Sequence, residues 1–117
     1  MEKSINKVEL SGFAGTNPEV RTMKNGNQMI RFSLATSTSY KNNNDEWVRN
    51  TTWHNVVMWD KLGEEALEKI RKGTFVSLQG KITYRQYTDK SGKKQNVVEI
   101  RAFSFEATEI VRKEKAA

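Results

Sequence analysis

Only one stretch of this sequence, residues 60–72, has the apolar spacing of a helix. Leu62, Ala66 and Ile70 recur there at helical intervals, acidic side chains come early and basic ones late, and Asp60 stands where an N-cap is expected. Nearly all the remaining apolar residues alternate with polar ones, which is the period of an extended strand. A single helix among alternating segments in 117 residues predicts one all-β domain.

The expected strands and turns follow a simple order along the chain. Residues 6–13, 29–36, 53–59, 74–87 and 97–105 are the main strands, with a short extended segment at 18–23 and a polar hairpin region at 37–50 whose tip is 42–45. Gly12 and Gly15 indicate a bend or bulge that leads into a turn. Gly80 interrupts a strand, which indicates a sharp bend or a close backbone approach. Five strands with one helix between the third and fourth predict an OB-fold, a five-stranded Greek-key barrel. We expect this domain to occupy residues 1–110, followed by a short charged tail at 111–117.

Composition excludes several classes of function. The chain has no cysteine and one histidine, and it lacks a glycine-rich phosphate loop and a nucleophile motif, so we expect no metal, no cofactor and no enzymatic activity. No apolar run exceeds four residues, which predicts no membrane span. The absence of cysteine fits the reducing cytoplasm. Twenty Lys and Arg against fourteen Asp and Glu favour an anionic partner such as nucleic acid.

The strand at 53–59 places two tryptophans on one face. That face carries Trp53, Asn55, Val57 and Trp59, and the other carries His54, Val56 and Met58. The second face suits a core. Two exposed indoles in a row would mark a binding surface on the first, whereas another element covering both rings would make them structural.

Further aromatic and cationic side chains accompany this strand. Tyr40 and Trp47 flank the polar hairpin tip, where they either form a cross-strand pair or face a ligand beside Lys41 and Arg49. The other outward residues are Arg31, Arg85, Tyr87 and a hairpin between residues 81 and 95 with five basic residues and one acid. Aromatic rings stack on bases and cations follow phosphates, so this combination predicts binding of a single strand with little sequence preference.

Several motifs in order give the chain a family resemblance. They are Asn6-Lys7-Val8, Pro18-Glu19-Val20-Arg21, Asn25-Gly26, Leu34-Ala35-Thr36-Ser37, Trp53-His54-x-Val56-Val57, Lys61-Leu62, Arg71-Lys72-Gly73 and Thr88-Asp89-x-Ser91-Gly92. Together they resemble the bacterial single-stranded DNA-binding protein (SSB) family over about residues 5–105. The resemblance implies an OB fold, usually assembled as a homotetramer, that binds single-stranded DNA in replication, repair and recombination. A nucleoid-associated location in the cytoplasm follows from it.

The resemblance also assigns roles to individual positions. The family's stacking aromatics correspond to Tyr40, Trp53, Trp59 and Tyr87, so the chain changes some ring types but keeps all four rings. The cationic positions along the DNA path correspond to Lys7, Arg21, Lys61, Arg71, Lys72 and Arg85. Asn55 stands where a cation is common, which implies a weakened phosphate contact. His54 matches a subunit-interface residue, or it is an ordinary half-buried imidazole.

The end of the sequence departs from the family pattern. Family members usually continue into a flexible tail with an acidic, apolar tip that recruits replication and repair proteins, whereas this sequence ends in a basic segment at 112–117. A shortened piece and a naturally short form both remain open. Two other readings also remain: a primosomal accessory protein of the same fold, typically dimeric, and an RNA-binding OB module.

Overall fold

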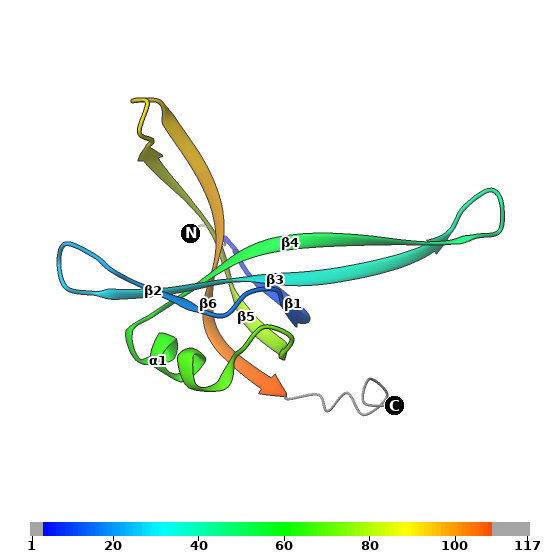
Figure 1. The fold of residues 1–117 in the computed structure, drawn as a ribbon, viewed down its shortest axis with the longest axis horizontal. Helices are drawn as coiled ribbons and strands as arrows, with labels where there is room; N and C mark the ends of the chain where they lie inside the picture. The colour runs from blue at the N-terminus through cyan, green and yellow to red at the C-terminus, as the bar shows by residue number, and fades with distance from the viewer. Residues whose placement is uncertain (1–3, 109–117) are drawn as a thin grey trace.

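A computed structural model describes residues 4–108 of the chain. The elements in it are β1 (Val8–Ala14), β2 (Glu19–Thr22), β3 (Gln28–Lys41), β4 (Trp47–Trp59), α1 (Asp60–Lys69), β5 (Phe75–Thr88) and β6 (Lys94–Thr108) (Figure 1). The domain boundary expected at residue 110 and the expected tail at 111–117 lie outside the described residues.

The strands form one sheet that closes on itself. Their order is β1-β5-β6-β4-β3-β2, and β1 also pairs with β3 through Phe13 opposite Ala35 and Ala14 opposite Leu34. Closure therefore involves the five long strands, with the short β2 added at the edge of β3. The β4–β6 pair is parallel. Among the five long strands the helix lies between the third and the fourth, which confirms the predicted OB fold.

Two glycines allow neighbouring strands to approach closely at the closure points. A Cβ atom on Gly12 would lie 2.0 Å from the carbonyl oxygen of Ala35, where β1 crosses β3. A Cβ on Gly80 would lie 2.2 Å from the carbonyl oxygen of Arg101, beside a register shift between β5 and β6. The close approach predicted as one possibility for Gly80 is confirmed, and Gly12, predicted as a bend or bulge, is a second one, so a side chain fits at neither position.

The core fills the barrel and continues between the barrel and α1. Ile30, Leu34, Val56 and Met58 are fully buried, and they pack with the helix residues Ala66 and Ile70. The inward face predicted for Val56 and Met58 is therefore confirmed. The helix itself begins differently from the prediction, because Trp59 rather than Asp60 occupies the N-cap position and no side chain caps it. Asp60 instead adopts a φ of 52° at the junction between strand and helix.

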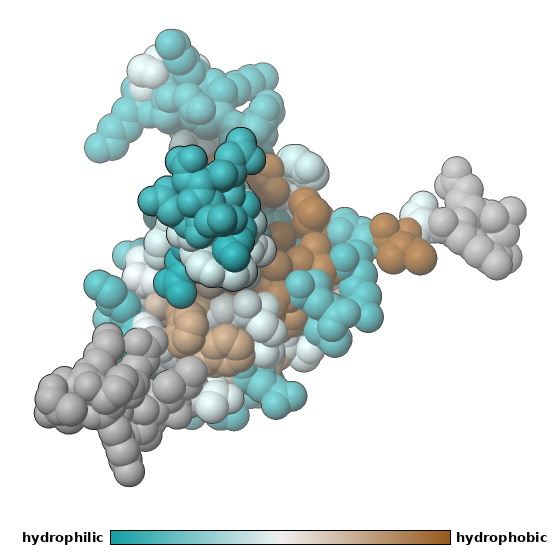
Figure 2. All heavy atoms as spheres, turned by 90° about the vertical axis from the view of Figure 1, so that its right-hand side faces the viewer, coloured by the Kyte–Doolittle hydropathy of each residue, from teal (hydrophilic) through white to brown (hydrophobic). Residues whose placement is uncertain are grey.

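Both long hairpins project beyond the barrel as two-stranded arms (Figure 1). The β3–β4 pairing continues to Lys41 opposite Trp47, so the flanks of the polar region 37–50, expected only as a hairpin region, are strand up to these residues. Their side chains are polar on both faces because no core covers an arm, and this removes the alternation from the sequence. With the tip of the β3–β4 arm toward the reader, Figure 2 shows hydrophilic arms and apolar residues gathered over the barrel.

Candidate nucleic-acid interface

One outer face of the barrel collects side chains from five strands. Residues opposite each other in neighbouring strands point to the same side of a sheet. The register pairs Ala35 with Trp53, Ser33 with Asn55, Arg31 with Val57 and Met29 with Trp59. It continues from Arg31 to Glu19 and from Met29 to Arg21 on β2, and from Val57 through Arg101 on β6 to Lys81 on β5. We call this surface the outer face.

Trp53 is the most exposed ring on the outer face of the barrel, at 62%. Its position depends on the loop after β1, because a Cβ on Gly15 would lie 2.3 Å from Trp53 Cζ3. That loop is held in place because the Gly15 amide donates to the Ser33 carbonyl at 2.8 Å and the Ser33 amide donates to Thr16 Oγ1 at 3.2 Å. The indole therefore rests against a fixed loop and leaves much of its surface open to a ligand.

Trp59 occupies a more enclosed position on the same face. It is half-buried, and the guanidinium carbon of Arg101 lies over its ring at 5.7 Å from the centroid, a cation–π contact. Val57 is only 2% exposed although it shares the face of Trp53. Its burial has a simple cause, since Arg31 and Arg101 flank it on either side in the register and long arginine stems cover apolar surface.

A groove lies between β4 and β6, next to the residues that precede their short parallel pairing. It encloses about 410 Å³ and is lined by Trp53, His54 and Asn55 from β4, and by 96–98 and Ile100 of β6. Asn55 is exposed there, and its contact with a ligand stays a prediction. The half-buried His54 makes a 2.9 Å hydrogen bond between its Nε2 and Thr36 Oγ1. Its expected place at a subunit interface stays a prediction.

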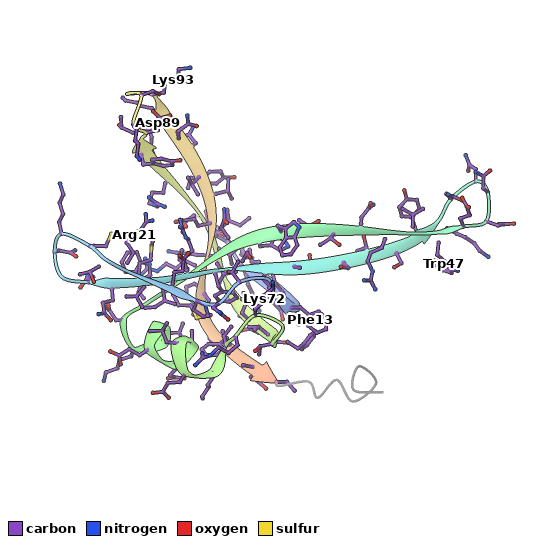
Figure 3. The ribbon with its side chains drawn as sticks, in the orientation of Figure 1. Phe13, Arg21, Trp47, Lys72, Asp89 and Lys93 are labelled. Carbon is purple, nitrogen blue, oxygen red and sulfur yellow. The ribbon has the colours of Figure 1, made fainter. Side chains whose placement is uncertain are left out.

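The aromatic residues of the β3–β4 arm do not form the cross-strand pair that was one of the two expectations. Tyr40 lies opposite Val48, and Trp47 lies opposite Lys41, whose Nζ is 5.8 Å from the indole centroid. Trp47 is 71% exposed near the end of the arm (Figure 3). Even steps along β4 place Trp47 on the ribbon face that carries Trp53, whereas Tyr40 lies on the other face.

The β5–β6 arm carries a third aromatic site. Tyr87 is 44% exposed, and the guanidinium of Arg85 lies 5.9 Å from its ring centroid. Arg85 is also paired with Glu99, through Nη2–Oε2 at 2.9 Å and Nε–Oε1 at 3.3 Å. Glu99 is 4% exposed, and the hydrogen bond to its carboxylate raises the pKa of Arg85 further above its ordinary value. The charge of Arg85 is thus largely compensated within the arm.

The remaining predicted cations lie around the helix and the first strand. Lys61 is exposed in the first helical turn, and Arg71 caps the end of α1 by donating from Nη1 to the carbonyls of Leu67 and Ile70. The amide of Lys72 donates to Asn17 Oδ1 at 2.8 Å, which places this exposed lysine beside the β1–β2 loop (Figure 3). Lys7 is exposed next to Glu9, with 4.0 Å between Nζ and Oε1.

The structure therefore divides the predicted site into groups. Trp53, Asn55, Trp59, Arg31 and Arg21 share the outer face, while Tyr87 with Arg85 lies on one arm and Trp47 with Tyr40 on the other. Lys61 lies in the first turn of α1, and Arg71 and Lys72 follow the last turn of that helix.

One cation of the outer face, Arg101, was missed by sequence reasoning. Alternation along the last strand showed on which side it lies, but only the β4–β6 pairing places it beside Val57.

Within residues 4–108 no group of acidic residues and histidine could hold a metal ion. No helix in the same region has the length and apolar content needed to cross a membrane.

A closed OB barrel with exposed aromatic and cationic side chains belongs to the oligonucleotide-binding class of this fold. Residues 5–108 match the Single-strand binding protein family, and the chain belongs to that family. It is 42% identical over 97 residues to the single-stranded DNA-binding proteins of Neisseria meningitidis serogroups A and B. That alignment covers 83% of this chain and 56% of each relative, so the chain spans about half the length of the curated relatives it matches.

Solved structures show the same fold. A Plasmodium falciparum SSB solved in complex with single-stranded DNA superposes with a TM-score of 0.78 and 28% identity, over 93% of this chain and 99% of that one. A deletion mutant of the Thermus aquaticus single-stranded DNA-binding protein gives a TM-score of 0.75 at 23% identity, over 90% of this chain and 51% of that one. The second comparison bears on the fold alone.

Proposed function

We propose that this chain binds single-stranded DNA with little sequence preference and protects it during replication, repair and recombination. The observation that supports this most directly is the 62% exposed Trp53, held against Gly15 on a face that also carries Arg21, Arg31 and Arg101. Membership of the Single-strand binding protein family and the likeness to a relative solved with single-stranded DNA agree with it.

In the proposed mechanism aromatic rings bind the bases and cations bind the phosphates. Bases stack on exposed rings at about 1–3 kcal/mol per base, and every base has a face that can stack, so the preference among bases is small. Cations along the path bind phosphates. A duplex presents no free base faces, so it should bind poorly. The proposed contact residues are Lys7, Arg21, Arg31, Tyr40, Trp47, Trp53, Asn55, Trp59, Lys61, Arg71, Lys72, Arg85 and Tyr87.

The surroundings of these side chains indicate that they contribute unequally to the binding of single-stranded DNA. Trp53 and Trp47 are free to stack because most of their surface is exposed. Arg71 and Arg85 already bind protein groups, so their contacts with phosphate should be weaker than those of Arg21 and Arg31. The protein is proposed to act without catalysis and without a cofactor, at the nucleoid of the cytoplasm.

Self-association belongs to the same proposal. We expect a homotetramer with His54 near a subunit contact, and a measured mass of two chains would instead favour a dimeric accessory protein. Light scattering of the intact chain would measure the number of subunits.

The test is tryptophan fluorescence during titration with poly(dT), repeated with duplex DNA and with an RNA oligonucleotide. Single-stranded DNA should quench the emission strongly and duplex should not, while tighter binding of RNA would favour an RNA-binding module. Trp53→Ala should weaken binding by about 1–3 kcal/mol with the fold retained.

Tyr84→Ala is the matched control for Trp53→Ala. Tyr84 is 76% exposed but lies opposite Val98, on the face of the β5–β6 arm away from Arg85 and Tyr87. Tyr84→Ala should therefore leave the affinity for single-stranded DNA almost unchanged. Equal effects of the two substitutions, or no quenching by any strand, would contradict the proposed function.

A further inference from the structure

A row of cations crosses the outer face at the level of Val57. The register runs from Lys81 on β5 to Arg101 on β6, past Val57 on β4, to Arg31 on β3. Neighbouring strands are about 4.8 Å apart, so Arg31 and Arg101 start from backbones roughly 10 Å apart on either side of Val57. Two guanidinium groups this close on one surface form a concentrated positive site.

Within residues 4–108 the cations of this row form no ion pair within 4.0 Å, although Glu19 lies opposite Arg31 in the register. Among the described residues, ion pairs within 4.0 Å join Lys7 to Glu9, Lys69 to Glu65 and Arg85 to Glu99. None of them involves Arg31, Lys81 or Arg101. Arg85, a cation that the family resemblance assigns to the DNA path, is held by the buried Glu99, whereas Arg101 is exposed and forms no ion pair with an acidic residue in the described part of the chain.

Arg101 is nevertheless held in a defined position. Its guanidinium lies over the Trp59 ring, 5.7 Å from the centroid. A cation over an indole is attracted by the negative face of the ring but keeps all its N–H donors, since the ring accepts no conventional hydrogen bond. The contact therefore fixes the side chain without using the donors that bind a phosphate. It also covers one face of Trp59, which removes that face as a stacking surface for a base.

We infer that Arg101 is a phosphate-binding residue of the single-stranded DNA path, positioned by Trp59 and acting beside Arg31 and Lys81. Arg101 supplies a positive charge for the phosphates, whereas the charge of Arg85 contributes weakly because Glu99 compensates it. Trp59 then positions Arg101 in addition to its proposed contact with the strand, and Trp53 is the more exposed stacking ring of the outer face. This inference rests on the proposed function, since it assigns a role within the same surface.

The test is the salt dependence of affinity for a dT oligonucleotide, measured for the intact chain and its variants. Each phosphate contact on a single strand contributes about 0.7 to the slope of log affinity against log salt. Arg101→Ala should make the slope shallower by about 0.7, so a fourfold rise in salt should weaken binding about 2.6-fold less than in the unmodified chain. Arg101→Lys should retain the slope, because the charge remains.

Matched variants separate this role from a structural one. Arg85→Ala should lower the melting temperature, because it leaves Glu99 buried without its partner, and should change the slope less than Arg101→Ala does. Lys69→Ala, on the helix and paired with Glu65, should change neither. Trp59→Phe keeps a ring under Arg101 and should preserve the slope, whereas Trp59→Ala should shift it toward that of Arg101→Ala.

The outcomes distinguish this inference from the proposed function. An unchanged slope in Arg101→Ala, with normal quenching of tryptophan emission by poly(dT), would overturn the role of Arg101 and leave the proposed function intact. A larger loss of slope in Arg85→Ala than in Arg101→Ala would overturn it as well. Failure of the unmodified chain to bind single-stranded DNA would overturn both.

Discussion

Substituting Gly15 by alanine tests whether the position of the Trp53 ring controls DNA binding. The added Cβ would lie 2.3 Å from Cζ3 and 3.1 Å from Cη2 of the indole. Reaching an ordinary contact of 3.4 Å requires a displacement of about 1.1 Å. The loop is tied to β3 by the 2.8 Å bond between the Gly15 amide and the Ser33 carbonyl, so the 62% exposed ring should move.

The displaced ring should stack less well on a base without being lost. Complete loss of a stacking ring costs about 1–3 kcal/mol, or about 5- to 150-fold in affinity. We therefore expect Gly15→Ala to weaken binding of poly(dT) by about 1 kcal/mol, near the lower end, with little change in melting temperature. Calorimetric titration would measure the affinity, and the depth of tryptophan quenching would report the position of the ring.

A double-mutant cycle shows whether the effect passes through the ring. In a Trp53→Ala background both indole contacts are gone and the nearest remaining atom is Ser33 Oγ, at 3.0 Å, so Gly15→Ala should have almost no further effect on affinity. Independent, additive losses in the double mutant would refute the reasoning. Unchanged affinity in the single mutant Gly15→Ala would refute it too, because the loop would then have absorbed the methyl group.

Three further predictions concern the fold and one arm. The Asp89 carboxylate accepts hydrogen bonds from the amide and hydroxyl of Ser91, from the Lys93 amide and from the Gln95 side chain, which lowers its pKa from 3.8 to about 2. The hydrogen bonds of the ionised Asp89 should hold the β5–β6 tip in place above pH 3.8, and they should be lost as the pH falls through about 2. The NMR signal of the Ser91 amide should follow this titration. Asp89→Asn should abolish it. Leu34→Ala, in the fully buried core, should lower the free energy of unfolding by about 2–5 kcal/mol in urea denaturation, and a loss below 1 kcal/mol would show a looser core. Gly12→Ala sets a methyl group 2.0 Å from a backbone oxygen and should cost about 1–3 kcal/mol or more, so native stability in this variant would contradict closure between β1 and β3.

Much of the fold could be predicted because its signals are local. A strand inside the barrel buries one face, so on β3 the buried Ile30, Phe32 and Leu34 alternate with the less buried Arg31 and Ser33 and reveal a period of two. The helix at Asp60–Lys69 changes that period to 3.6, and its place among the strands indicated the OB layout. The β3–β4 arm gave no such signal, because its strands lie outside the core and bury neither face. Pairing of β3 with β4 up to Lys41 and Trp47 was therefore missed.

The composition of the candidate site was equally visible, but its arrangement was not. Trp53 and Asn55 could be recognised as exposed because they alternate with core residues on a single strand. The relation of Trp59 to Arg101 depends on a parallel pairing between β4 and β6, strands separated by the helix and all of β5. No local pattern encodes a contact between residues so far apart in the chain.

Local period and residue type by themselves determined an all-β chain with one helix, a basic surface and exposed aromatic rings, because these properties depend on each residue and its near neighbours. Only the tertiary structure decided which cations remain available to a ligand. Pairing of β5 with β6 holds the buried Glu99 against Arg85, whereas the β4–β6 pairing leaves Arg101 exposed over Trp59, so two arginines on neighbouring strands have different electrostatic surroundings. Charge compensation depends on distances between side chains of different strands, and these are set when the strands pair.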